Sequence, residues 1–371
     1  MNEPKLGTRE LEYVTECVET GWVSSAGRFI GEFEAGWAAY CGRRHGIAVS
    51  SGSAALQVAL AALPLEPGDE VVLPTFTIVS CATAVLSAGA VPVLVDADPE
   101  TWTMDVEQLE ARIGPRTRGV MPVHIYGHPA DMDPILESAE RHGLVVAEDA
   151  AEAHGAEYRA RSGEWRRCGG FGALSCFSFY ANKLVTTGEG GMVVTDDDAL
   201  AERLRSLRNL CFLPDRRFYH EELGFNFRLT NLQAALGVAQ LERIDQIVAR
   251  KHEVAAAYTS GLQGLDGLAL PVEKPWARSV YWMYGVVVDE ATGLDAAAFA
   301  ARLRERGVDT RPFFLGMHEQ PALHRLGLFR GERYPVAERL ARQGLYLPSG
   351  LALTDEQVET VCGAVREALR A

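Results

Sequence analysis

The chain has 371 residues, of which 47% are apolar and 23% are charged, a composition typical of an ordinary globular protein and not of a disordered segment. Acidic residues outnumber basic ones by 50 to 36, and the formal net charge of −14 argues against a protein that binds nucleic acid through its phosphates. A chain of this length exceeds what one hydrophobic core usually serves, so two domains are expected.

Short β-rich runs and helical patterns alternate from about residue 46 onward. The β-rich runs are residues 46–50, 69–74, 91–98, 117–124, 144–149, 173–180 and 190–197. The helical patterns that alternate with them are residues 53–63, 78–89, 105–113, 132–143 and 198–209. Repeated β-helix-β units of this kind predict an α/β fold, with a mainly parallel sheet covered by helices on both faces and ligands gathered at the carboxyl ends of the strands.

The pattern changes near residue 230. Residues 230–262 have apolar positions at intervals of three and four, which predicts a long helical stretch that bridges two domains. Three further segments suggest a smaller α+β domain: a strand candidate at 279–289, a helix at 295–307 and a last helix at 354–369. We therefore predict a large domain over residues 1–245 and a small C-terminal domain over residues 246–371, with residues 1–30 near the functional site.

The seven cysteines are scattered, with no C-x-x-C pair and no histidine at the spacing of a zinc site. We therefore expect free thiols in a reducing cytoplasm and no metal site. The first residues, MNEPKLGTRELEYV, include acidic side chains and no apolar stretch, so no secretory signal is predicted. No run of 18 apolar residues occurs, so no membrane span is predicted either.

Asp149 and Glu148 end the apolar run of residues 144–149. A carboxylate at the carboxyl end of a parallel strand points into the crevice where a cofactor would lie. Taken alone, such an Asp is more often a helix N-cap or a solvated loop residue. Its meaning therefore depends on the chemistry of the other residues near that edge of the sheet.

Lys183 follows the run of residues 173–180, among small and apolar residues and ahead of several glycines. A desolvated lysine has a lowered pKa, which frees its amine as a nucleophile. A lysine that forms an imine, together with a distant Asp that keeps a pyridine nitrogen protonated, is the pattern of a pyridoxal-phosphate enzyme. Lys183 and Asp149 fit that pattern.

The stretch SSGSAAL, from Ser50 to Leu56, opens a predicted helix with small residues. The backbone N–H groups exposed there, together with the positive end of the helix dipole, can hold a phosphate. Serine and glycine also cap helices that bind nothing, so this signal is weak on its own.

Seven segments together resemble the DegT/DnrJ/EryC1/StrS family of sugar aminotransferases. In chain order they are GWVSSAGRFIGEFE, AVSSGSAALQVAL, TRGVMPVHIYGHPADMDPI, VAEDAAEAHGAEY, FSFYANKLVTTGEGGMVVT, GFNFRLTNLQAALGVAQLERID and TRPFF. The resemblance covers nearly the whole chain. Within the family, VYWMY, TRPFF and HPADMDP are most similar to the branch of GDP-perosamine synthases, which transaminate a GDP-linked 4-keto-6-deoxy sugar.

The resemblance implies a fold type I, aspartate aminotransferase-like enzyme that uses pyridoxal 5'-phosphate. It also implies a homodimer or a dimer of dimers, with active sites at the subunit interface. From the net charge and the lack of a long apolar run, no nucleic-acid or membrane partner is expected. Carried over by motif, Lys183 would form the imine with the cofactor and Asp149 would pair with its pyridine nitrogen. The phosphate would be held by Ser178, Gly52 and Ser53, and from the neighbouring subunit by Asn226 and Arg228.

The family's activity implies a ping-pong reaction. L-glutamate would donate its amino group, leaving 2-oxoglutarate and pyridoxamine 5'-phosphate as the intermediate form of the cofactor. A nucleotide-linked keto-deoxy sugar, similar to GDP-4-keto-6-deoxymannose, would then accept the amino group. Lys183 would carry the cofactor and also act as the general acid and base.

Two positions depart from the family pattern. Ile78 stands where many relatives have a Tyr or Phe that stacks on the pyridine ring, and Phe76 would serve instead only if that segment is extended. Glu152 stands where many relatives have Gln or His near the cofactor's phenolic oxygen. Two anionic oxygens would repel, so either Glu152 is protonated or the contact is indirect.

Substrate contacts are predicted from three further segments. Trp22, Ser24 and Ser25 match the N-terminal segment that borders the sugar site in relatives, although a surface loop is an equal alternative. Arg311 and His318 would meet the diphosphate of the sugar nucleotide or the carboxylate of the donor.

Two groups of ring-bearing side chains have simpler interpretations. Tyr281, Trp282 and Tyr284 are expected mainly in the core of the small domain, with stacking on a base or sugar as the alternative. His124 and His128 flank a tight turn and lack the partners of a metal site.

Rival functions remain open. The same chemistry could act on a dTDP- or UDP-linked keto sugar, a GDP-octose or a keto-cyclitol. A dehydratase branch of the family has histidine in place of the lysine, and Lys183 argues against it. A non-catalytic regulatory homologue is the alternative from another class, and the complete Lys, Asp and Ser set argues against that too.

Overall fold

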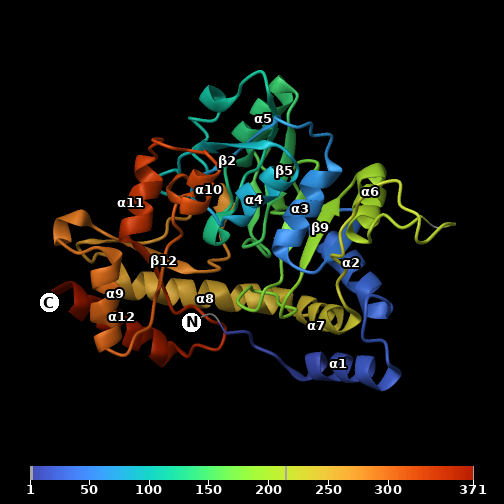
Figure 1. Ribbon diagram of the computed structural model, residues 1–371. Helices are drawn as coiled ribbons and strands as arrows, with labels where there is room; N and C mark the ends of the chain where they lie inside the picture. The colour runs from blue at the N-terminus through green and yellow to red at the C-terminus, as the bar shows by residue number, and fades with distance from the viewer. Residues whose placement is uncertain (1–2, 214, 371) are drawn as a thin grey trace.

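In the computed structural model, which describes residues 3–213 and 215–370, the centre of the molecule is a seven-stranded sheet (Figure 1). Its order is β1-β9-β8-β5-β4-β2-β3. The strands are β1 (His45–Val49), β2 (Glu70–Pro74), β3 (Val91–Val95), β4 (Thr117–Val120), β5 (Val145–Asp149), β8 (Leu174–Ser178) and β9 (Gly191–Thr195). Only β9 runs antiparallel to its neighbours in this sheet, and the other paired strands are parallel. The predicted mainly parallel sheet is confirmed.

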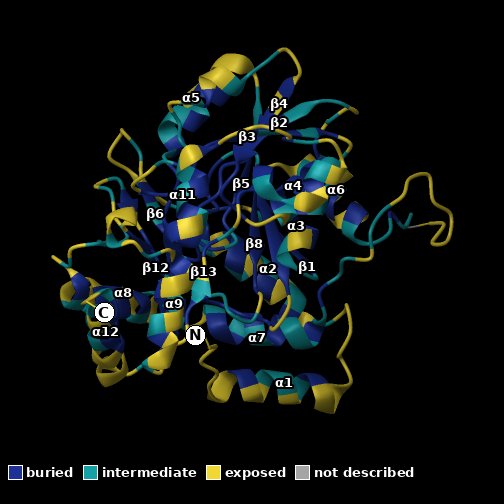
Figure 2. Ribbon diagram, turned by 60° about the vertical axis from the view of Figure 1, so that its left-hand side comes forward, coloured by how far each residue is buried: buried dark blue, intermediate teal, exposed yellow. Residues whose placement is uncertain are grey.

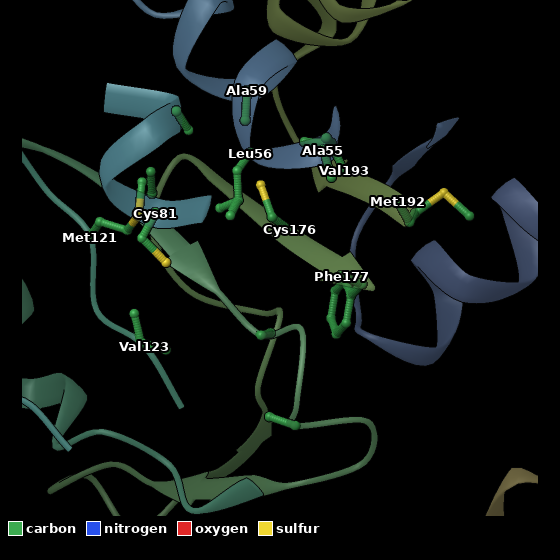
Figure 3. Close-up of a cluster of buried hydrophobic side chains, with 14 of the residues drawn as sticks. Ala55, Leu56, Ala59, Cys81, Met121, Val123, Cys176, Phe177, Met192 and Val193 are labelled. Atoms are coloured by element: carbon green, nitrogen blue, oxygen red, sulfur yellow. The ribbon is translucent and has the colours of Figure 1, made fainter. Parts of the chain in front are cut away.

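Helices cover both faces of this sheet. They are α2 (Arg28–Tyr40), α3 (Gly52–Ala62), α4 (Ser80–Ser87), α5 (Met132–His142), α6 (Asp198–Arg208) and α7 (Asn231–Leu241). On β8, Cys176 points toward Leu56 of α3, whereas Phe177 points the other way (Figure 3) and lies 5.1 Å, ring centre to ring centre, from Trp37 of α2. Neighbouring residues of a strand face opposite sides, so α3 and α2 lie on opposite faces.

Burial explains why most residues of these strands are apolar. In Figure 2 the strands are buried, while the outer sides of α5 and of α1 (Thr8–Thr20) are exposed. Strands covered on both faces need apolar residues at every position and not only at alternate ones. All seven cysteines are free and buried, as expected from the sequence. Among the described residues, no helix has the length and apolar character needed to cross a membrane.

The predicted long helix over residues 230–262 is in fact two helices, α7 and α8 (Ile244–Leu262), which are separated at Arg243. Arg243 has φ −125°, outside the helical range, and its guanidinium donates to Glu10 of α1 at 2.6 Å. An apolar period continues across such a break, so the pattern alone cannot reveal it. The break lets α7 pack on α1 and α2 while α8 continues toward a second sheet.

This second sheet has four antiparallel strands, in the order β10-β12-β14-β13. They are β10 (Leu268–Ala269), β12 (Tyr284–Val288), β14 (Gly344–Leu347) and β13 (Arg311–Pro312). Helices α9 (Ala296–Glu305), α11 (Pro335–Gln343) and α12 (Asp355–Arg370) accompany it. The remaining elements are β6 (Glu157–Arg159), β7 (Trp165–Arg167), β11 (Ala277–Arg278), α10 (Pro321–Arg325) and four short 3₁₀ helices (Glu110–Arg112, Ile125–Gly127, Glu290–Thr292 and Met317–Glu319).

Helix α8 carries side chains of both cores. Ile244 and Ile247 belong to the core of the large sheet, whereas Val254 and Tyr258 belong to the core of the second sheet. The division between residues 245 and 246 therefore stays a prediction, because one helix serves both sides of it.

Candidate active site

A cavity of about 320 Å³ opens at the carboxyl ends of β5 and β8, next to the start of α3. Seven of the residues predicted from the sequence line it together: Gly52, Ser53, Ile78, Asp149, Glu152, Ser178 and Lys183. They come from separate parts of the chain, and they meet because β5 and β8 are parallel neighbours that end at the same edge.

Lys183 lies in the loop after β8, and its side chain is only 9% exposed. Its Nζ lies 3.4 Å from Oε1 of Glu152 and 3.6 Å from the centre of the Trp282 ring. Burial lowers the pKa of the Lys183 amine, while the carboxylates of Glu152 and Asp149 act in the opposite direction. The amine is therefore shielded from water but remains within reach of two acids, as a nucleophile and proton carrier requires.

Asp149 ends β5 and is 2% exposed. Its two carboxylate oxygens accept from different donors: Oδ2 from the Cys81 thiol at 3.1 Å and Oδ1 from the Ala151 N–H at 3.0 Å. Burial raises the pKa of Asp149, and these hydrogen bonds and the Lys183 charge oppose that rise. The carboxylate is thus fixed in one orientation at the floor of the cavity.

Glu152 also lies at the cavity and is 7% exposed. Its Oε2 accepts from the N–H of Tyr126 at 2.8 Å, and Tyr126 has an unusual φ of +53°. Burial is the largest influence on the pKa of Glu152 and raises it. A raised pKa favours the protonated carboxyl, the form that donates to an anionic oxygen.

The start of α3 forms the third side of the cavity. The Ser51 hydroxyl accepts from the N–H of Ala54 at 3.1 Å, whereas the N–H groups of Gly52 and Ser53 lie in the first turn, where no acceptor within the helix is available. A Cβ on Gly52 would lie 2.6 Å from Cβ of Ser178, so only glycine lets these segments approach so closely. The resulting hollow fits an anion at a helix N-terminus.

These groups fit pyridoxal phosphate. The Lys183 amine suits its aldehyde, the buried carboxylate of Asp149 suits its ring nitrogen, and the hollow beside Gly52 and Ser178 suits its phosphate. The fit depends on three different chemical functions that converge on a single cavity.

Phe76 does not take the place of the missing aromatic residue. Ile78 lines the cavity and is 40% exposed, but Phe76 is fully buried with its ring centre 5.8 Å from that of Phe313. Strand β2 ends at Pro74 and the chain bends over residues 75–77, so Phe76 and Ile78 do not share a strand face. The expectation that Phe76 could stack on the cofactor is therefore wrong for this structure.

A second group of predicted residues lies away from Lys183, around a separate cavity of about 680 Å³. Ser25 and Arg228 line this arginine cavity, together with three further arginines, Arg205, Arg208 and Arg217. Arg208 pairs with Glu34, but Arg205, Arg217 and Arg228 form no ion pair within the described residues. Four arginines around one cavity are notable in a chain of net charge −14.

The other predicted residues of this group adjoin the arginine cavity without lining it. Asn226 is exposed and pairs through its backbone with Asn209, whose side chain accepts from Arg228 at 2.8 Å. Trp22 is 57% exposed, and the carbonyl of Ser24 accepts from the N–H of Asn231 at 2.6 Å. None of these residues lines the Lys183 cavity of the same chain.

Arg311 and His318 lie outside both cavities. Arg311 pairs with Asp309 at 3.2 Å, and across the sheet it faces Tyr346, which does line the Lys183 cavity. His318 is 4% exposed and its Nδ1 is 2.8 Å from the hydroxyl of Thr75. Its burial behind Thr75 contradicts a direct contact between His318 and a substrate, because the imidazole is already packed into the protein.

Trp282 is the main cavity residue that the sequence did not reveal. It was expected mainly in the core of the small domain, but it is 4% exposed in the core of the large sheet, and its ring also lines the cavity next to Lys183. Phe314 and Tyr346, from the second sheet and its loops, line the cavity too. Strand β12 begins only at Tyr284, so the alternation of a strand does not apply to Trp282. The only feature of the sequence that pointed to Trp282 was the cluster of aromatic residues just before β12.

His124, in the turn after β4, has a structural role. His124 donates through Nε2 to Glu148 at 2.7 Å and accepts at Nδ1 from the N–H of Ala130 at 2.9 Å. Glu148 also accepts from Ser175 at 2.6 Å. Cys168 lies close enough to complete a cluster that a metal could use, but the polar atoms of His124 and Glu148 are already hydrogen-bonded, and we assign no metal there.

Comparisons with known proteins agree over nearly the full length of the chain. The sequence profile of the DegT/DnrJ/EryC1/StrS aminotransferase family matches residues 4–366. GDP-perosamine synthase of Caulobacter vibrioides is 44% identical over 370 residues, which cover 99% of this chain and 97% of the relative. The dTDP-3-amino-3,4,6-trideoxy-alpha-D-glucose transaminase of Streptomyces venezuelae is 43% identical over 342 residues, which cover 90% of this chain and 86% of the relative.

A solved structure has the same architecture. The crystal structure of DesV from S. venezuelae, in complex with a ketimine intermediate, superposes with a TM-score of 0.89 at 39% identity. The superposition covers 98% of this chain and 94% of that one.

Proposed function

Because this chain belongs to the DegT/DnrJ/EryC1/StrS aminotransferase family, we propose that it is a pyridoxal-phosphate-dependent enzyme that transfers an amino group from L-glutamate to a nucleotide-linked keto-deoxy sugar. The observation that carries the proposal is the buried Lys183 amine, 3.4 Å from Glu152 in the cavity that Asp149 also lines. The seven free thiols support a reducing cytoplasmic location.

Each side chain of the cavity has a proposed task. When bound, pyridoxal phosphate would supply an aldehyde that carries nitrogen and a cationic ring that withdraws electrons from the neighbouring carbon. The Lys183 Nζ takes the proton from the α-carbon of glutamate, and in the second half-reaction it delivers a proton to the sugar carbon that receives nitrogen. Asp149 keeps the ring nitrogen protonated, because a buried carboxylate needs a cationic partner.

The remaining cavity groups bind and orient the cofactor. The N–H groups of Gly52 and Ser53 and the hydroxyl of Ser178 hold the phosphate. Burial raises the pKa of Glu152, which favours a protonated carboxyl that would donate to the phenolic oxygen. Ile78 gives an apolar contact to one face of the ring in place of a stacked aromatic side chain.

We propose a GDP-linked 4-keto-6-deoxy sugar as the acceptor, for deoxyamino-sugar biosynthesis. The relative named GDP-perosamine synthase supports this choice, since it aligns over 99% of the chain. A dTDP-linked keto sugar is the second candidate, because the relative named for a dTDP-linked product is nearly as similar, at 43% identity.

A panel of GDP-, dTDP- and UDP-linked 4-keto-6-deoxy sugars with isotope-labelled glutamate tests the donor and the acceptor together. We expect labelled nitrogen in the GDP-linked product first and fastest, together with release of 2-oxoglutarate, both measured by mass spectrometry. Turnover of a dTDP- or UDP-linked sugar alone would reject the GDP assignment and keep the aminotransferase. Failure of every sugar to accept nitrogen from any amino acid would reject the enzyme.

We also propose a homodimer, or a dimer of dimers, in which two chains share each active site. The predicted site residues fall into two groups that do not meet within one chain, one around Lys183 and one around Arg228. The segment near the arginine cavity also exposes large apolar side chains, with Phe218 at 83% and Leu223 at 89%. Exposed apolar side chains beside unpaired arginines suit a surface that a second copy covers, and the arginines would meet the phosphates of the cofactor or of the sugar nucleotide.

Mixed dimers test this sharing. One chain carries Lys183→Ala and the other carries Asn226→Ala with Arg228→Ala, and two different tags allow purification of the mixed species. If the sites are shared, one of the two sites is intact, and we expect about half of the wild-type activity per dimer although either homodimer is inactive.

The matched control puts all three substitutions on one chain and pairs it with a wild-type chain. Shared sites predict almost no activity here, because each site then contains one damaged half. Sites confined to single chains predict the reverse, with an inactive first mixture and a half-active control.

A further inference from the structure

Trp282 contacts Lys183 in two ways. The ring centre of the indole lies 3.6 Å from the Lys183 Nζ, a distance typical of a cation–π contact. The indole Nε1–H donates to the backbone carbonyl of Asn182 at 2.8 Å, and Asn182 directly precedes Lys183. One side chain therefore holds both the amine and the backbone of the lysine that carries the proposed chemistry.

Trp282 is itself held from several sides. Its backbone carbonyl accepts from Nζ of Lys251 at 3.0 Å, and the same amine donates to the carbonyl of Ser349 at 2.6 Å. A Cβ on Gly127 would lie 2.9 Å from the Trp282 nitrogen, so the two backbones are in close contact. Tyr281, the residue before it, has φ +45°, a left-handed conformation that a bulky residue keeps only when its surroundings enforce it.

Lys251 is an unusual anchor, because it is 1% exposed and forms no ion pair with a carboxylate in residues 3–213 and 215–370. Burial lowers the pKa of this amine to about 7. It lies on α8, and its two acceptors come from the loops before β12 and after β14. Lys251 therefore ties together the segments of the second sheet that bring Trp282 to the cavity.

We propose that Trp282 is a positioning residue that presents the Lys183 amine to the cofactor aldehyde, and that Lys251 keeps Trp282 in place. The inference rests on the proposed function. When the neutral amine bonds to the aldehyde carbon, a carbon–nitrogen double bond replaces the carbonyl, and both amine hydrogens leave with the oxygen as water. An unrestrained lysine populates many rotamers, and most of them hold the nitrogen away from that carbon.

The test compares the affinities for two forms of the cofactor. Pyridoxal phosphate has the aldehyde that Lys183 captures, whereas pyridoxamine phosphate lacks it and otherwise fills the same cavity. The ratio of the two dissociation constants therefore reports on the lysine alone. Lys183→Ala shows how far the ratio falls when capture is lost altogether.

Trp282→Phe keeps a ring and removes the Nε1–H donor. We expect it to weaken pyridoxal phosphate binding about threefold to tenfold, since one hydrogen bond is lost, and to change pyridoxamine phosphate binding less than about twofold. Lys251→Met, similar in length, should lower the same ratio by about twofold to threefold through the loss of its hold on Trp282. Trp276→Phe and Lys274→Met, which alter a Trp and a Lys outside the cavity, should leave the ratio unchanged.

Two results would overturn the inference: equally weakened binding of both cofactor forms, or unchanged binding of both. A purely structural residue would affect the binding of both forms, and a residue without a role would affect neither. A wild-type protein that does not prefer the aldehyde form, or a Lys183→Ala variant that keeps the preference, would count against the proposed function instead.

Discussion

Replacing Lys183 by alanine is expected to abolish amino transfer, with a fall in kcat/KM of at least about 10⁴-fold. Both proposed roles of the residue are lost at once, since no other lysine lines the cavity. The other three lysines of the chain are Lys5, Lys251 and Lys274. Initial rates with glutamate and the keto sugar measure the loss.

A second measurement identifies the lysine directly. After incubation with pyridoxal phosphate and reduction with borohydride, the peptide that contains Lys183 should carry the cofactor mass in the wild type and in a Lys274→Ala control. Lys274 pairs with Glu100 away from the cavity, so its loss should change neither labelling nor rate. Labelling at another lysine, or a Lys183→Ala variant that retains activity, would contradict the assignment.

Replacing Asp149 by asparagine should lower kcat/KM by about 10²- to 10⁴-fold, the effect of about 3–5 kcal/mol that removal of one partner from a buried charge pair produces. An asparagine nearly matches the volume of the carboxyl and keeps one oxygen for the Cys81 or Ala151 donor. It cannot keep a ring nitrogen cationic, so the loss should fall mainly on kcat.

The matched control is Asp131→Asn. Asp131 also has its pKa raised by burial and accepts from the Tyr158 hydroxyl at 2.7 Å, but it does not line the cavity. We expect near wild-type rates from it. If both variants lose activity together with thermal stability, the role of Asp149 is structural and the assignment to the ring nitrogen is wrong.

The contrast between Asp149 and Trp282 shows which features of the site are readable from the chain alone. Asp149 ends one apolar run and Lys183 follows another. Because the carboxyl ends of parallel strands lie at the same edge of a sheet, the sequence alone places both residues at that edge. Trp282 lies in the loop just before β12 of the second sheet, more than ninety residues after Lys183 in the chain. Trp282 and Met283 pack in the core of the large sheet and Tyr284 in the core of the second sheet, and this tertiary packing brings the indole to the amine.

Contacts between distant segments also explain the three predictions that the structure corrects, which concern Phe76, His318 and the helix break at Arg243. Phe76 and Ile78 would share a face if the chain stayed extended, but it bends after Pro74 and buries Phe76 among aromatic side chains from distant segments. From its motif, the imidazole of His318 was expected to be accessible to a substrate. In the structure it is buried and hydrogen-bonded to the hydroxyl of Thr75, a residue far away in the sequence. The break at Arg243 leaves the apolar period unchanged and becomes visible only where Arg243 meets Glu10.

By itself, then, the amino-acid sequence determined the parallel sheet and the edge of it where the ligand would bind. It also determined the amine of Lys183, the carboxylate of Asp149 and the phosphate-binding helix start expected at that edge. These depend on periodicity and on residues next to the ends of strands, which are local properties of the chain. The tertiary structure alone decided which aromatic side chain lies beneath Lys183, which predicted residues are buried, and which ones gather at a second cavity. Those outcomes depend on contacts between segments far apart in the chain, whose free energies no local pattern encodes.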